Sequence, residues 1–254
     1  MTILVADWAS FEQVLPIAVD HNLGLEIQEF TRPENIDDPD VWIEIIMERT
    51  KSLPVLSIHG PFAELIPASM DPLVKHVAER RFQQAYDIAQ KTGAEHLILH
   101  SGYFPKTYPR EKWIQNSYGF WLDFLKDKPK PGLIHIENVY EDDFSMLKET
   151  IDMINDAYND EMLTLCLDIG HVNANSTHSL EEWIQGLGNR IRYAHLHNNG
   201  GILDDHWRFD RGTIDFQSVL EYLQRNSPNA AWSVETIGDD IEPSLLWLQA
   251  RGYL

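Results

Sequence analysis

The stretch LTLCLDIGHVN, residues 163–173, runs from apolar residues directly into a polar group. The residues up to Leu167 have the composition of a buried strand. Asp168 and His171 follow, and Gly170 between them allows the backbone to turn freely. A carboxylate and an imidazole at the end of a single strand have an ordinary structural explanation as hydrogen-bonded residues. Their meaning therefore depends on whether other strands of the chain end in the same way.

Seven further runs rich in Ile, Leu and Val are spaced along the chain, and amphipathic helices fit between them. Ser10 with Gln13 and Ser179 with Glu182 have the spacing of capping boxes, which mark two of the helix starts. Eight strand–helix units, mostly about 30 residues apart, predict an α/β fold with a single (β/α)8 TIM barrel over residues 1–254. The predicted strands are residues 2–6, 24–30, 54–60, 96–102, 133–139, 163–170, 191–198 and 231–237.

The composition argues against several classes of protein. The formal net charge is −20, and a chain this acidic repels the phosphates of nucleic acid, which makes nucleic acid an unfavourable partner. The single cysteine, Cys166, cannot form an internal disulfide, which fits a reducing compartment. The start MTILVADWAS has no signal-peptide pattern, and no run approaches the ~20 apolar residues of a membrane span. We therefore expect a soluble, cytoplasmic protein with no membrane partner, whose oligomeric state the sequence does not determine.

Ionisable residues recur at the predicted strand ends, where the active site of a TIM barrel lies. Each of them alone is more often a hydrogen-bonded structural residue than a ligand. Together, carboxylates and imidazoles crowded at one end of a barrel without nearby Lys or Arg would repel and lose solvation, and a divalent cation resolves that conflict. Histidine with carboxylates and no thiolate favours Zn, Mn, Fe or Co. The residues are His59, His100, Glu137, Asp168, His171, His195, His197, Asp204, His206 and Glu235.

Seven short motifs, taken in order, resemble the xylose isomerase-like TIM barrel superfamily, which contains sugar phosphate isomerases and epimerases and the endonuclease-IV-type AP endonucleases. The resemblance covers nearly the whole chain. The motifs are IHGPF (58–62), LHSG (99–102), IEN (136–138), LDIGH (167–171), HLHNN (195–199), DDH (204–206) and VET (234–236).

The resemblance implies a set of metal ligands. A first divalent metal (Zn, Mn or Co) would be held by Glu137, Asp168, His197 and Glu235. Further metals, up to three in all, would be held by His59, His100, His171, Asp204 and His206. On the seventh strand His195 and His197 share one face, so either could be the ligand. We favour His197 because it lies nearer the end of the strand.

The resemblance also implies an activity. We expect a metal-dependent isomerase or epimerase that acts on a small sugar, polyol or sugar phosphate by proton transfer through a metal-bound enediolate. Glu137 and Glu235 would be the catalytic residues that exchange protons with the substrate. The substrate-binding candidates are His171, His195, Arg208 and Arg211, although the two arginines could equally pair with Asp210 and Asp215.

Two alternatives stay open. The first is a multi-metal zinc phosphoesterase of the endonuclease IV type, in which His171 would join Asp204 and His206 around a separate metal. The negative net charge and the absence of a basic run favour a small phosphoester over DNA as its substrate. The second alternative is a non-catalytic barrel that binds a sugar or a metal.

Overall fold

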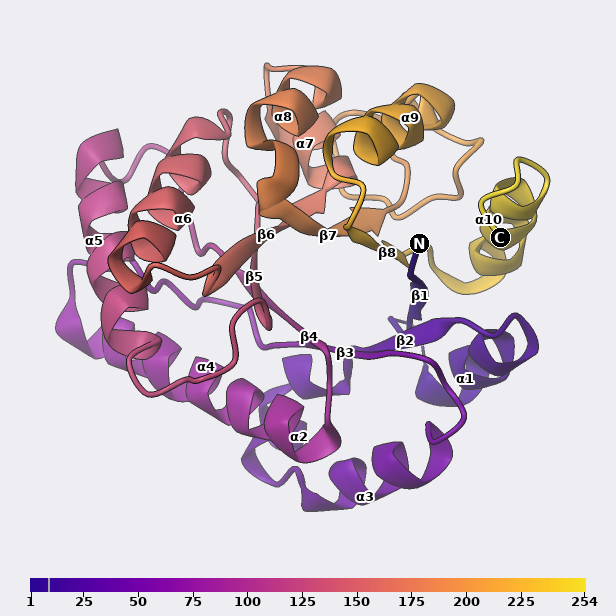
Figure 1. Cartoon of the computed structure of the whole chain (residues 1–254), viewed down its shortest axis with the longest axis horizontal. Helices are drawn as coiled ribbons and strands as arrows, with labels where there is room; N and C mark the ends of the chain where they lie inside the picture. Colours follow the sequence, from indigo (N-terminus) through magenta and orange to yellow (C-terminus); the bar gives the residue numbers. More distant parts are fainter. Residues whose placement is uncertain (9) are drawn as a thin grey trace.

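The computed structural model describes residues 1–8 and 10–254 and contains a closed barrel of parallel strands surrounded by helices (Figure 1). Neighbouring strands follow the order of the sequence, and β8 closes the barrel against β1. The predicted TIM barrel is therefore confirmed, and every strand lies within its predicted run. The strands are β1 (Ile3–Ala6), β2 (Gly24–Ile27), β3 (Leu56–His59), β4 (His96–His100), β5 (Ile134–Glu137), β6 (Leu163–Asp168), β7 (Ile191–Leu196) and β8 (Ala231–Val234).

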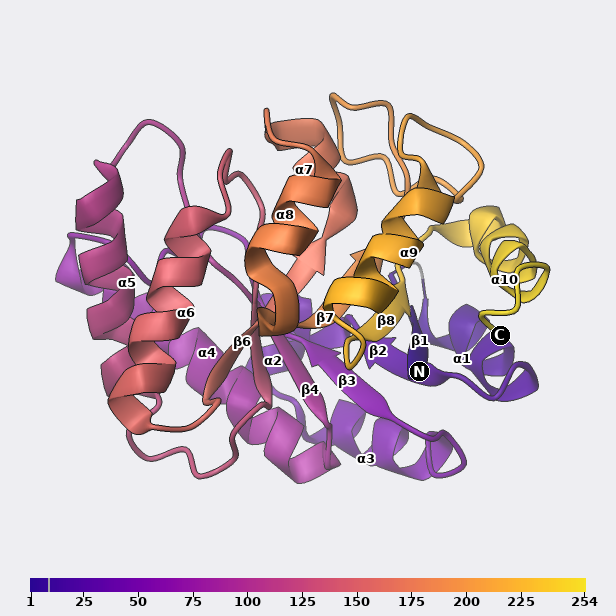
Figure 2. The ribbon, with the colours of Figure 1, turned by 45° about the horizontal axis from the view of Figure 1, so that its top comes forward.

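The helices form an outer ring around the strands, and Figure 2 shows the long loop between β7 and α9 rising beyond one end of the barrel. No helix among residues 1–8 and 10–254 is long and apolar enough to cross a membrane. Short 3-10 turns cover Glu29–Thr31, Gly188–Arg190 and Gly238–Asp240. The α-helices are α1 (Phe11–Asp20), α2 (Pro33–Asp37), α3 (Asp40–Arg49), α4 (Pro72–Thr92), α5 (Arg110–Phe124), α6 (Ser145–Tyr158), α7 (Ile169–Asn175), α8 (Leu180–Leu187), α9 (Phe216–Asn226) and α10 (Ile241–Gln249).

One of the two predicted capping boxes forms. The side chains of Ser179 and Glu182 exchange hydrogen bonds with each other's backbone at the start of α8. The prediction for Ser10 is wrong, because its hydroxyl makes no capping bond. Its backbone carbonyl instead accepts from the N–H groups of Gln13 and Val14, which closes the first turn of α1 without a side chain.

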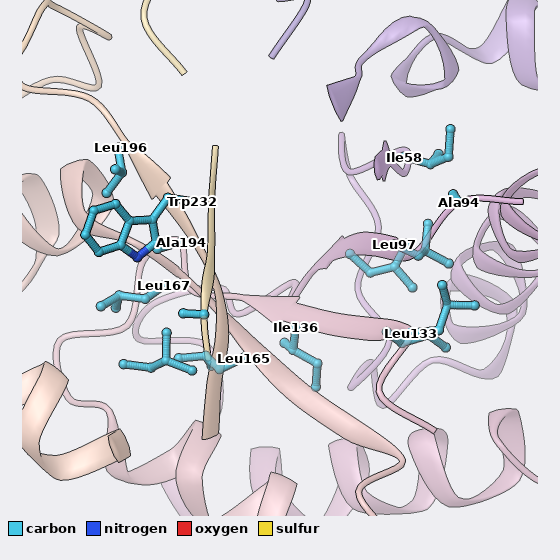
Figure 3. Close-up of a cluster of buried hydrophobic side chains, with 14 of the residues drawn as sticks. Ile58, Ala94, Leu97, Leu133, Ile136, Leu165, Leu167, Ala194, Leu196 and Trp232 are labelled. Carbon is cyan, nitrogen blue, oxygen red and sulfur yellow. The ribbon is translucent and has the colours of Figure 1, made fainter. Parts of the chain in front are cut away.

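The side chains of the strands divide between two environments, as the alternation of a pleated strand requires. Outward-facing residues such as Leu97, Ile136 and Trp232 pack with the helices in the main apolar cluster, part of which Figure 3 shows. A much smaller apolar cluster, which includes Cys166 and Tyr193, fills the inside of the barrel. Buried polar side chains, among them Glu26, His135 and Glu137, also lie on the strands of the barrel.

Candidate metal centre

A cavity of about 610 Å³ lies at the C-terminal ends of the strands. Imidazoles and carboxylates from these strand ends form its floor, whereas aromatic and aliphatic side chains from the loops form its walls. No lysine or arginine is among the described residues that line it. The lining residues are Trp8, Gln28, His59, Phe62, Ala63, Glu64, Leu65, Ile66, His100, Gly102, Tyr103, Phe104, Glu137, Val139, Tyr140, His171, Asp204, His206 and Glu235.

Three carboxylates surround one imidazole nitrogen next to the cavity, and two of them, Glu137 and Glu235, line it. The Nδ1 atom of His195 lies 3.4 Å from Oε1 of Glu137, 3.6 Å from Oδ2 of Asp168 and 3.3 Å from Oε2 of Glu235. All four side chains are buried. Within residues 1–8 and 10–254 this Nδ1 atom has no hydrogen-bond partner, although buried polar atoms are rarely left unpaired. One nitrogen and three carboxylates are a donor set that suits Zn, Mn or Co, so the residues present fit a divalent cation.

Glu137 also belongs to a second group. Its Oε2 atom lies 3.2 Å from Nε2 of His59 and 3.2 Å from Nε2 of His100, while its Oε1 atom faces His195. The two oxygens of this carboxylate therefore point to different imidazoles. The side chains of His59, His100 and Glu137 can bring one ligand atom each within 4.8 Å of the others. The geometry would allow Glu137 to bridge two cations.

A third group lies around Asp204 in the loop that follows β7. Its Oδ2 atom is 3.2 Å from Nε2 of His171 and 2.9 Å from Nε2 of His206. The Asp204 side chain is 37% exposed, so this group is the most open to solvent of the three. His171, Asp204 and His206, which we expected to hold an additional metal, thus lie side by side.

Three imidazoles of the second and third groups are oriented in the same way. Each has its Nδ1 atom 2.7–2.8 Å from a backbone carbonyl oxygen. Because a carbonyl oxygen only accepts hydrogen bonds, Nδ1 must carry the proton, and in the neutral ring the Nε2 lone pair is then directed toward a carboxylate. Histidines that bind a metal through one ring nitrogen typically donate a hydrogen bond from the other ring nitrogen in this way. The pairs are His59 with Gly60, His171 with Asn138, and His206 with Glu235.

The structure distinguishes the two histidines of β7. His197 does not approach Glu137; its Nε2 atom lies 3.1 Å from Oδ2 of Asp168 and 3.6 Å from Oδ1 of Asp204. Its ring stacks on His206 with 4.0 Å between the ring centroids. It is His195, one pleat earlier, that faces the three carboxylates. We therefore propose His195, in place of the predicted His197, as the fourth member of this set.

Arg208 and Arg211, which we expected to bind substrate, are not among the residues that line the cavity. Nε of Arg208 pairs with Oδ1 of Asp210 at 2.7 Å, as the alternative explanation required. The guanidinium of Arg211 instead lies over the ring of Trp207, 4.3 Å from its centroid. Each guanidinium thus has a local partner, an ion pair for Arg208 and an aromatic ring for Arg211, and we exclude both from the proposed site.

The acid–base properties of the floor residues differ from one another. Burial opposes the ionisation of Glu137, but the charges of His100 and His195 outweigh it and hold the pKa of Glu137 well below its ordinary value. Burial raises the pKa of Glu235, and its neighbouring imidazoles offset that effect only in part. Burial lowers the pKa of His206, but Asp204 and Glu235 raise it to about 9. The two candidate catalytic carboxylates thus have pKa values shifted in opposite directions.

Sequence reasoning missed the aromatic walls of the cavity. Phe62, Tyr103, Phe104 and Tyr140 lie within a few residues of the ends of β3, β4 and β5, and Trp8 follows β1. Their position just after polar strand ends was a usable signal, since the loops after the strands of a TIM barrel form its active site. It was overlooked because single aromatic residues in loops carry no spacing pattern.

A model of the xylose isomerase-like TIM barrel family matches residues 17–254 of this chain. The chain belongs to this family. Among its curated relatives are two uncharacterized proteins of Methanocaldococcus jannaschii, MJ1311 and MJ1614, at 27% and 26% identity over 184 and 174 residues. These matches cover 70% and 66% of this chain but only 63% and 66% of the two relatives, slightly less than two thirds of their length.

Several solved structures have the same fold. The TTHB071 protein from Thermus thermophilus, soaked with ZnCl2, has a TM-score of 0.79 at 24% identity and covers 99% of this chain and 98% of its own. A D-tagatose 3-epimerase-like protein has a TM-score of 0.77 at 24% identity over 98% of this chain and 96% of its own. A structure named as L-ribulose 3-epimerase has a TM-score of 0.74 at 16% identity over 98% and 86%. Sugar epimerases and a zinc-soaked protein are therefore among the structural neighbours.

Proposed function

We propose that this chain is a divalent-metal-dependent isomerase or epimerase that acts on a small uncharged sugar or polyol. The observation that carries the proposal is the unpaired Nδ1 atom of His195, surrounded by Glu137, Asp168 and Glu235, of which Glu137 and Glu235 line the cavity. A cation held by these four side chains would polarise adjacent carbonyl and hydroxyl oxygens of a substrate. The epimerases among the structural neighbours support this class of reaction.

Two residues of the site are suited to move the proton. Glu137 from β5 and Glu235 from β8 both face Nδ1 of His195 and approach it from well-separated strands of the barrel. The opposite shifts of their pKa values favour different starting states, with Glu137 ionised and Glu235 the carboxyl that holds a proton more readily. Together they would remove a proton from the carbon next to the carbonyl and return one to the neighbouring carbon or to the other side of the same carbon.

The walls of the cavity support an uncharged substrate. A phosphate group is usually held by Arg, by Lys or by backbone N–H groups at a helix start, and the described lining offers neither of those side chains. Aromatic side chains such as Phe62 and Tyr103 instead provide flat apolar surfaces on which the C–H faces of a sugar ring can pack. We therefore favour a sugar or polyol without phosphate over a sugar phosphate.

A second function has a specific observation in its favour. Glu137 is shared between the His195 group and the His59–His100 group, and Asp204 gathers a third group. Three cations in these groups would suit a phosphoesterase, because clustered metals activate water and stabilise the leaving oxygen. The absence of cationic side chains in the described lining favours a small phosphoester over DNA in that case as well.

One experiment separates the two functions. The purified protein is stripped with a chelator, reloaded with Zn²⁺, Mn²⁺ or Co²⁺ to known stoichiometry, and incubated in D₂O with a panel of ketoses, aldoses and phosphoesters. We expect deuterium incorporation next to a sugar carbonyl once a single cation per chain is bound. Release of phosphate that begins only after two or three cations are bound, with no deuterium exchange, would establish the phosphoesterase instead.

A further inference from the structure

Glu26 on β2 is a buried carboxylate inside the barrel that does not line the cavity. Its Oε2 atom accepts a hydrogen bond from the hydroxyl of Tyr193 at 2.6 Å, and its Oε1 atom accepts one from Nε2 of Gln28 at 3.0 Å. Nε2 of His195 lies 3.1 Å from Oε1 and 3.2 Å from Oε2. Because it lies beneath the floor, Glu26 acts on the site through other residues and does not contact a substrate directly.

The contact between Glu26 and His195 determines which nitrogen of the imidazole faces the carboxylates of the floor. An ionised carboxylate only accepts hydrogen bonds, so Nε2 of His195 must carry the proton of this contact. A neutral ring then has its lone pair on Nδ1, the atom that faces Glu137, Asp168 and Glu235. With the opposite tautomer, Nδ1 would carry a hydrogen and could not bind a cation.

The other two contacts hold Glu26 in this orientation. Tyr193 and Gln28 each bind one of its oxygens, and the carboxylate therefore cannot turn away from His195 without breaking a buried hydrogen bond. Gln28 also donates from Nε2 to Oε1 of Glu235 at 3.1 Å, which connects the same network to the floor of the cavity.

We propose that Glu26 is a positioning residue that fixes the tautomer and ring orientation of His195 and thereby sets the cation affinity of the centre. The role rests on the proposed function, since it requires that His195 bind a metal through Nδ1. It also assigns a purpose to the buried carboxylate on β2.

The test combines a variant with a measurement on the unmodified protein. Dissociation constants for Zn²⁺ and Co²⁺ are measured by competition with a chelator for the wild type, Glu26→Gln and Tyr193→Phe. We expect Glu26→Gln to weaken cation binding about 10- to 100-fold, the usual effect of removing a partner of a metal-binding histidine. Tyr193→Phe removes one of the two hydrogen bonds that hold Glu26 in place but leaves the Glu26–His195 pair, so we expect it to weaken cation binding less than Glu26→Gln does.

The second measurement is made on the wild type. The ¹⁵N chemical shifts of the imidazoles are recorded for the Zn²⁺-loaded wild type, with His195→Gln used to assign the signal of His195. We expect a protonated Nε2 and a Zn²⁺-bound Nδ1. A Zn²⁺-bound Nε2, or a Glu26→Gln variant that binds both cations as tightly as the wild type, would overturn the role of Glu26 while leaving the metal centre in place. A wild type that binds neither cation would instead refute the proposed function.

Discussion

The imidazole of His197 packs directly onto Gly170. A Cβ atom built on Gly170 would lie 1.9 Å from Cε1 of His197, far closer than two carbon atoms can approach. Gly170 lies inside α7, and it is not among the residues with positive φ. The glycine is therefore required by the close approach of a ring, and our interpretation of it as a freely bending turn was wrong.

Gly170→Ala should displace His197 and the stacked ring of His206. Overpacking of this kind usually costs about 1–3 kcal/mol, and we expect a lower melting temperature together with at least tenfold weaker cation binding. Gly119→Ala is a matched control, because Gly119 also lies in a helix and a Cβ atom there has no neighbour within 4 Å. The control should be stabilised by about 0.5–1 kcal/mol. Equal melting temperatures for Gly170→Ala and the wild type would contradict the packing argument.

The two histidines of β7 should differ in their contribution to cation binding. His195→Gln removes the Nδ1 atom that faces three carboxylates, whereas His197→Gln removes a ring that contacts only Asp168 and Asp204 among the acidic residues that the structure describes. Isothermal titration of the chelator-treated variants with Zn²⁺ should show at least a tenfold greater loss of affinity for His195→Gln. The reverse order would restore our sequence-based choice of His197.

Asp168→Asn should separate the charge of Asp168 from its structural role. The Oδ1 atom accepts a hydrogen bond from the backbone N–H of His171 at 2.6 Å and caps α7, and an asparagine oxygen can preserve that bond. We expect α7 to persist but the cation to be lost. A chelator should then lower the melting temperature of the wild type but not that of the variant. A cation present at a free concentration of 100 times its Kd stabilises the native state by about 2.7 kcal/mol. A variant that retains full metal content would show that Asp168 is not a ligand.

Asp7→Asn should change how stability depends on pH. Burial raises the pKa of Asp7 from 3.8 to about 8. Between these values the unfolded chain has released the proton and the folded protein still binds it, so the wild type loses stability as pH rises. The variant retains an oxygen that can accept from the backbone N–H of Gln28 and has no charge to bury.

We therefore expect wild type and Asp7→Asn to be about equally stable near pH 4, and the variant to be more stable near pH 8 by an amount on the order of a few kcal/mol. Urea unfolding at pH 4, 6 and 8 measures the difference. Stability curves that run parallel over this range would mean that Asp7 is already ionised in the folded protein.

The sequence alone determined the fold and most of the residues that form the floor of the cavity. Short apolar runs alternating with amphipathic helices leave few topologies other than a parallel barrel, because crossover connections are right-handed and parallel strands need them. Parallel strands also end at the same face, so residues such as His59, Glu137 and Glu235 had to converge wherever their strands lay in the barrel. Both the fold and the convergence of the strand ends therefore follow from patterns within short segments of the sequence.

Only the tertiary structure decided which residues meet within that floor. His195 and His197 both point inward by the alternation of a strand, and their height relative to Asp168 depends on the register between β6 and β7. An irregularity between Leu165 and Cys166 shifts that register and places His195 beside Asp168. The pairing of neighbouring strands, the approach of His197 to Gly170 and the local partners of Arg208 all depend on residues outside the segment that carries each pattern. A shift of register by two residues exchanges the neighbours of a side chain while the same side chains still point inward, so no pattern within one segment could reveal the pairing.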